Sequence, residues 1–107
     1  MSELAQLSFT ATLVGEGGGG DMLASHVALP DELARKVAAH ELHQRILTGK
    51  RRAFGSVKVD ATIGESAWST SIFPQKDGRW LLPVKSSVRR AEGKDEGDDI
   101  TVSLKLL

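Results

Sequence analysis

The stretch Gly97-Asp98-Asp99-Ile100-Thr101-Val102-Ser103-Leu104-Lys105-Leu106 ends the second half of the chain with the cleanest alternation of apolar and polar residues in the sequence. A period of two is typical of a β-strand with one buried face. The residues from Phe54 onward repeat this pattern in shorter runs, and turn residues separate the runs. The second half of the chain therefore predicts a small antiparallel β-barrel.

We expect the closing strand to run from Asp99 to Leu106, and further strands precede it. Residues 57–63 alternate and end at Gly64-Glu65, which fits the glycine-first turn between antiparallel strands. Residues 67–73 form the partner strand of that hairpin. We expect the next strand, Trp80 to Leu82, to end at Pro83, because proline cannot donate a hydrogen bond to a neighbouring strand.

Two segments have a helical pattern instead. Asp31 and Glu32 place negative charge at the start of a stretch with apolar residues at helical spacing. The end of this helix is open, since it could run to about Leu47 or break near His40. Residues 40–52 could accordingly be helix, loop or disordered. We also expect a short helical turn between Ser86 and Ala91, capped by its serines.

The first half of the chain predicts a hairpin. Residues 7–13 alternate as a strand, and Met22 to Leu29 form the returning strand, which Pro30 stops. Between them, the glycine run Gly15 to Asp21 has no side chains to pack, so we interpret it as a mobile hairpin tip.

Composition narrows the class of protein. The 107 residues suit one domain, so we expect residues 1–107 to form a single β-barrel. The 14 basic and 14 acidic residues balance, so the chain has no net charge that would attract it as a whole to nucleic acid or to an anionic membrane. The chain has no cysteine, no signal-like start and no apolar run long enough to span a bilayer. We therefore expect a cytoplasmic protein with no membrane partner.

A resemblance to a known family rests on motifs spread over most of the chain. The motifs are strongest in its second half: Phe54-Gly55-Ser56-Val57, Ile63-Gly64, Trp68-Ser69-Thr70-Ser71-Ile72-Phe73-Pro74, Gly78, Leu82-Pro83-Val84-Lys85, Val88-Arg89-Arg90 and Gly97-Asp98. With these motifs the sequence resembles the bacterial and archaeal DUF1905 family, a domain of unknown function. The segment from about His40 to Arg52 departs from the family pattern because it is longer than the usual link.

The resemblance implies a fold but no chemistry. It implies a mainly β protein, a small double-split antiparallel β-barrel, with one α-helix after the second strand and a short helical turn before the last strand. That fold is shared at a distance with swapped-hairpin transcription regulators. The family as a whole has no established activity, so the resemblance implies no catalytic residue and no cofactor.

Basic residues near the predicted helical turn make the best candidate site. Lys85, Arg89 and Arg90 gather there, and the helix start with its serines could add donors for an anion. Trp68 could add a stacking surface, although core packing is its ordinary role. The ordinary alternative for the basic residues is surface pairing with nearby acids, namely Glu92, Asp95, Glu96 and Asp98.

Other candidate chemistries find little support in the sequence. The glycine run lacks the Lys-Ser/Thr and the helix start of a phosphate-binding loop. His40 and His43 share a helix face but are only two ligands, so we expect no metal site. No serine has the spacing of a nucleophile elbow.

These observations lead to two hypotheses. The first is a non-enzymatic binding module for a small anionic or peptide ligand, with Trp68, Lys85, Arg89 and Arg90 as ligand-binding residues and no cofactor. The alternative is a nucleic-acid-binding protein, which the distant fold relationship and two basic clusters suggest. The clusters are Lys50-Arg51-Arg52 and the group of Lys85, Arg89, Arg90 and Lys94. We expect a monomer or a weak dimer, since the chain is long enough to close its barrel alone.

Overall fold

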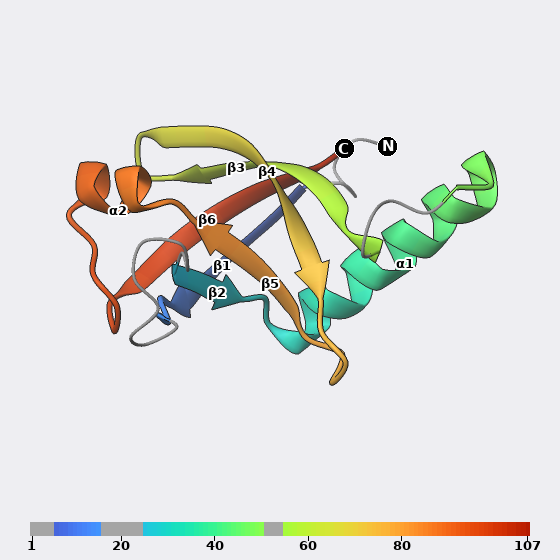
Figure 1. Ribbon diagram of the computed structural model, residues 1–107, viewed down its shortest axis with the longest axis horizontal. Coiled ribbons are helices and arrows are strands. Elements are labelled where there is room, and N and C mark those ends of the chain that lie inside the picture. The colour runs from blue at the N-terminus through green and yellow to red at the C-terminus, as the bar shows by residue number, and fades with distance from the viewer. Residues whose placement is uncertain (1–5, 16–24, 51–54) are drawn as a thin grey trace.

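Six strands pair edge to edge and curl into a nearly closed barrel in the residues that the structure, a computed structural model, describes (6–15, 25–50 and 55–107; Figure 1). The strands are β1 (Gln6–Thr12), β2 (Ser25–Ala28), β3 (Val57–Ile63), β4 (Ser66–Pro74), β5 (Trp80–Val84) and β6 (Asp99–Leu106). The helices are α1 (Asp31–Thr48) and α2 (Ser86–Glu92). This architecture confirms the predicted mainly β fold, with its helix after the second strand and its short helix before the last.

The strand order is β1-β6-β3-β4-β5-β2, and each neighbouring pair is antiparallel. β6 lies between β1 and β3, so the strand with the strongest alternation has partners on both sides. The two outer strands meet at one point: Val14 and His26 exchange two backbone hydrogen bonds of 2.8 Å. This bridge closes the barrel.

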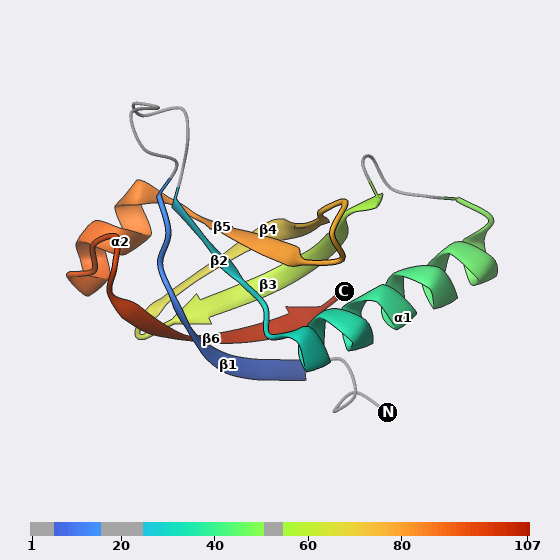
Figure 2. The same cartoon turned by 90° about the horizontal axis from the view of Figure 1, so that it is seen from below.

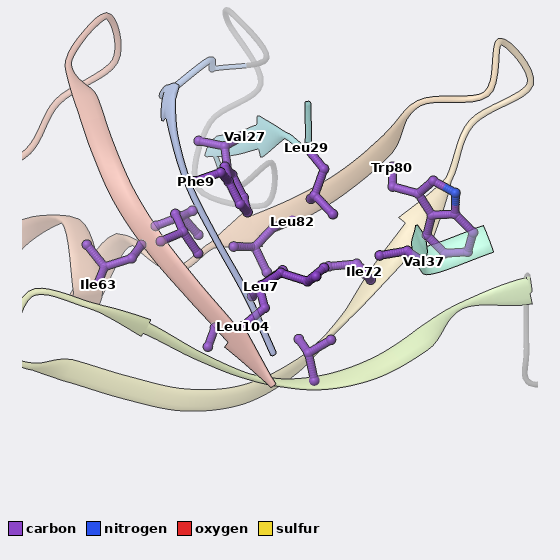
Figure 3. Close-up of a cluster of buried hydrophobic side chains, with 14 of the residues drawn as sticks. Leu7, Phe9, Val27, Leu29, Val37, Ile63, Ile72, Trp80, Leu82 and Leu104 are labelled. Carbon is purple, nitrogen blue, oxygen red and sulfur yellow. The ribbon is translucent and has the colours of Figure 1, made fainter. Parts of the chain in front are cut away.

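The core follows from the period of two, because alternate residues of a strand point to the same face. In β6, Ile100, Val102, Leu104 and Leu106 are buried, while the residues between them are exposed. Figure 3 shows Leu7, Ile72, Leu82 and Leu104 pointing into the space between the strands. Their burial supplies the main stabilisation of the fold.

Paired strands separate at two places, which makes the barrel double-split. In the described residues, β1 and β2 are joined only by the single bridge between Val14, which lies just beyond β1, and His26. β4 and β5 pair only through Phe73 with Leu81 and Pro74 with Trp80. Along the rest of β4, its edge toward β5 has no strand partner in the described residues. We call this second opening the β4–β5 split.

Pro83 does not end its strand, contrary to our prediction, because β5 continues to Val84. Pro83 lies opposite His26 of β2, and the His26 backbone bonds to Val14 on its other side. The ring nitrogen of Pro83 therefore faces β4, at the level where β4 has already separated. A missing N–H group is tolerated at such an unpaired edge.

The turn between β4 and β5 is held by an aspartate. Asp77 accepts hydrogen bonds from the backbone N–H of Arg79 at 3.0 Å and from its Nε at 2.8 Å. These bonds favour the charged carboxylate and lower the pKa of Asp77 below its ordinary value.

α1 continues past His40 and ends at Thr48, so the longer of the two predicted helices is correct. Gly49 terminates it with φ of 71°, a left-handed conformation that glycine adopts without steric cost. Ala34 and Val37 are buried against the barrel, whereas Ile46 is 70% exposed. Figure 2 shows the second half of α1 projecting beyond the sheet.

α2 spans seven residues, and its N-cap is Lys85 rather than a serine. No side chain caps the helix, so the predicted capping by serines is wrong. A helix this short has a weak dipole, which leaves its N-terminus without special affinity for an anion.

Three predicted features lie outside the described residues. They are the glycine run from residue 16 on, the start of the second predicted strand, and the pair Arg51 and Arg52.

Candidate functional site

The strongest candidate site lies where α2 covers one end of the barrel, beside the turn between β3 and β4 (Figures 1 and 2). Val88 is buried and anchors the helix. A narrow hollow lies beneath α2, lined by Leu13, Ile63, Val84, Val88, Arg89, Glu92, Lys94 and Ile100. It is too narrow for a water-sized sphere. We call this region the α2 end.

Two side-chain N–H groups at this end of the barrel are buried without a hydrogen-bond partner. They are Nε1 of Trp68 and Nε of Arg89, the only such side-chain atoms in the described residues. Trp68 lies in β4 opposite Ala61 and packs against the core, and Arg89 lies in α2, which contacts β4. Buried polar groups normally have a partner, and one without a partner costs about 1–3 kcal/mol.

Trp68 and Arg89 lie in β4 and α2, two elements that contact each other, whereas the other two predicted site residues lie at the surface. Lys85 and Arg90 are exposed. Arg90 follows Arg89 directly in a helix, so the two side chains point in directions that differ by about 100°. Arg90 therefore does not share the buried environment of Arg89.

The predicted surface ion pairs of these basic residues are not found. Between described residues, ion pairs join Arg45 to Glu41 and Arg79 to Asp77, and neither involves α2. Lys85, Arg89 and Arg90 thus have no carboxylate within 4.0 Å in the described part of the chain. Glu92 lines the same hollow as Arg89, yet it forms no ion pair with Arg89.

The carboxylates near α2 bind serines instead. Glu92 accepts a hydrogen bond of 2.6 Å from Ser66 at the start of β4, and Glu96 accepts one of 3.2 Å from the buried Ser25. Sequence reasoning missed both bonds because their partners are 26 and 71 residues apart, which no local pattern reveals. The Ser66 bond holds the end of α2 against β4.

The histidines do not form a metal site in the described residues, where no three metal-ligating side chains gather. The Nε2 atom of His40 lies 3.3 Å from the carbonyl oxygen of Leu107. His43 is exposed on α1, and His26 lies in β2 at the bridge to Val14.

Two wider hollows lie elsewhere. One of about 490 Å³ lies between the second half of α1 and the start of β3, where Glu41, Arg45, Lys58 and Leu107 contribute to its lining. The other, of about 560 Å³, lies on the outer face of β1, β6 and β3, with Ser8, Asp60 and Lys105 in its lining. Neither contains the predicted site residues.

Comparison with known proteins identifies a family but assigns no activity. No curated protein matches this sequence. In the described residues, no helix is long and apolar enough to cross a membrane. The family model described as domain of unknown function (DUF1905) matches residues 9–104, which is nearly the whole chain. The chain therefore belongs to the DUF1905 family.

Proposed function

We propose that the protein is a cytoplasmic, non-enzymatic binding module that takes an anionic group at the α2 end. The observation that carries this proposal is the pair of buried N–H donors, on Trp68 and Arg89, without an acceptor. A carboxylate or phosphate oxygen would accept from both types of donor, and its bond to the guanidinium would be charge-assisted.

Access to these donors requires a movement. The hollow beneath α2 is too narrow for water, so an anion reaches Nε of Arg89 only if α2 shifts away from β4. Few contacts oppose such a shift, because α2 has one buried residue and one hydrogen bond to β4. The exposed Lys85 and Arg90 would attract the anion to this end of the barrel.

The test is a titration of the parent protein and two matched variants with inorganic phosphate and with acetate. Arg89→Met removes the proposed donor, and Arg35→Met removes one exposed charge on α1 as a control. We expect the anion to shift the indole N–H resonance of Trp68 but not that of Trp80 in the parent and in Arg35→Met. Loss of this response in Arg89→Met supports the proposal. No Trp68 shift in the parent, or equal shifts in all three proteins, would exclude it.

The exposed cations of α2 also favour a second candidate, binding of nucleic acid through phosphates. Lys85 and Arg90 lack ion pairs in the described residues, which leaves them available for phosphate contacts. Such binding should weaken linearly with the logarithm of salt concentration. A gel-shift assay with duplex DNA and RNA at several salt concentrations tests it, and the absence of a shift at low salt rejects it.

A further inference from the structure

The edge of β4 along the β4–β5 split is an unpaired strand edge. Across the two-residue turn Gly64-Glu65, Ile63 and Ser66 face each other as a hydrogen-bonded pair. Along the hairpin, hydrogen-bonded pairs then alternate with pairs that share no backbone hydrogen bond. Consequently Ala67, Ser69 and Ser71 direct their backbone N–H and C=O groups away from β3. Within the part of the chain that the structure describes, these three residues form no backbone hydrogen bond to an element other than β4 itself.

Two of the usual protections against strand pairing, charged side chains and proline, are missing from the free part of this edge. Edge strands are normally protected by charged side chains, by proline or by a bulge. From Ser66 to Gln75 the sequence has no charged residue, and its one proline, Pro74, lies beyond the free part. The side chains of Ala67 and Ser69, on the outer face of β4, are exposed. Five residues of free edge span about 17 Å, the length of a five-residue peptide strand.

The charges beside the split favour one polarity of such a peptide. β4 starts at the α2 end, where Ser66 bonds to Glu92. A peptide that runs antiparallel to β4 would end its chain there, next to Arg89 and Arg90. Its C-terminal carboxylate would then meet cations that have no ion pair in the described residues.

We propose that the free edge of β4 binds an extended peptide as an added antiparallel strand, with the C-terminal carboxylate of the peptide at the α2 end. This inference rests on the proposed function, because it identifies the anionic group as the end of a peptide. Main-chain hydrogen bonds supply affinity in such complexes, and the carboxylate sets the register.

The probe is a synthetic array of pentapeptides in which each position is varied among β-branched and aromatic residues. The peptides are attached through their amino ends, and each is made with a free carboxylate and with an amide at the other end. Two variants form a matched pair. Ser69→Pro and Ser69→Ala both lose the hydroxyl that bonds to Asp60, but only Ser69→Pro loses the backbone N–H at the edge.

We expect carboxylate peptides to bind both the parent and Ser69→Ala. Their affinity for Ser69→Pro should be lower by a factor of about ten or more. Hydrogen exchange at Ala67, Ser69 and Ser71 should slow in the complex. Circular dichroism and thermal unfolding check that Ser69→Pro remains folded; if it does not, slowed exchange at these three amides in the parent decides the question.

Three results would overturn this inference. The first is equal binding of Ser69→Pro and Ser69→Ala, when both are folded. The second is equal binding of carboxylate and amide peptides. The third is pairing of β4 with a second copy, seen by light scattering as a dimer that Ser69→Pro dissociates. If phosphate shifts Trp68 while no peptide binds, the proposed function stands and only this inference fails; if neither ligand acts, both fail.

Discussion

The two ends of the barrel are each covered by a helix, yet they are built differently. At the α1 end, Ala34 and Val37 are buried, and Val37 lies beside Trp80, which is 5% exposed (Figure 3). At the α2 end, Val88 packs inward, but Arg89 and Trp68 each bury an N–H group without a partner. One end is thus an ordinary core, and the other carries polar groups that cost stability. Sites of binding commonly carry such a cost.

The two tryptophans give the largest expected difference between the ends. Trp80→Ala should lower the free energy of unfolding by about 3–5 kcal/mol, because a fully packed aromatic side chain is lost. Trp68→Ala should cost only about 1–2 kcal/mol, because Trp68 is half-buried and its N–H is unpartnered. Urea denaturation measures both values, and equal losses would remove the contrast between the ends.

A glycine beneath α2 gives the next largest effect. Gly64 has φ of 59°, and a Cβ atom there would collide with the carboxylate of Glu92. Gly64→Ala should therefore cost about 2–3 kcal/mol, from backbone strain and the loss of the bond to Ser66.

The matched control for this change is Gly93→Ala. Gly93 has φ of 67° and no atom within 4 Å of the added Cβ, so only backbone strain of about 1–2 kcal/mol is expected. Chemical denaturation compares the two variants. If Gly93→Ala cost as much as Gly64→Ala, the contact of Glu92 with the hairpin would contribute no stability.

Arg89→Met should raise stability by about 1 kcal/mol in the absence of an anion, because it removes a buried donor that lacks an acceptor. The same variant should lose the response of Trp68 to phosphate. A thermal unfolding curve without added anions measures the gain. A clear loss of stability would instead show that Arg89 has a structural role at the α2 end.

The projecting half of α1 should give the smallest effect. Ile46 is 70% exposed and Leu47 is 66% exposed, so Ile46→Glu should change the free energy of unfolding by less than about 0.5 kcal/mol. Light scattering of the parent should give the molar mass of one chain, 11.5 kDa. A dimer that Ile46→Glu dissociates would show that a second copy covers this part of α1.

Much of the fold could be predicted from the sequence because it depends on local periodicity. The closing strand from Asp99 to Leu106 has the predicted bounds, since its alternation is regular and both of its edges find partners. The prediction that Pro83 ends β5 was wrong, because a strand can contain proline where no neighbouring strand needs its N–H group. Whether β4 is close to β5 at Pro83 depends on the shape of the whole sheet.

The candidate site could be predicted only in part. Arg89 and Trp68 were expected from the charge of one segment and the aromatic residue of another, but the sequence does not separate Arg89 from Arg90. The rotation of a helix from one residue to the next separates them, because it buries Nε of Arg89 and leaves Arg90 exposed. The bonds of Glu92 to Ser66 and of Glu96 to Ser25 join residues with no relation in sequence.

The amino-acid sequence by itself determined which residues form strands, which face of each strand is buried and where α1 begins, because these depend on side-chain spacing along a few residues. The tertiary structure alone decided where β4 leaves β5, which donors are buried without a partner and which edge stays open. Those features depend on the curvature of the closed sheet, which brings together residues that are far apart in the chain.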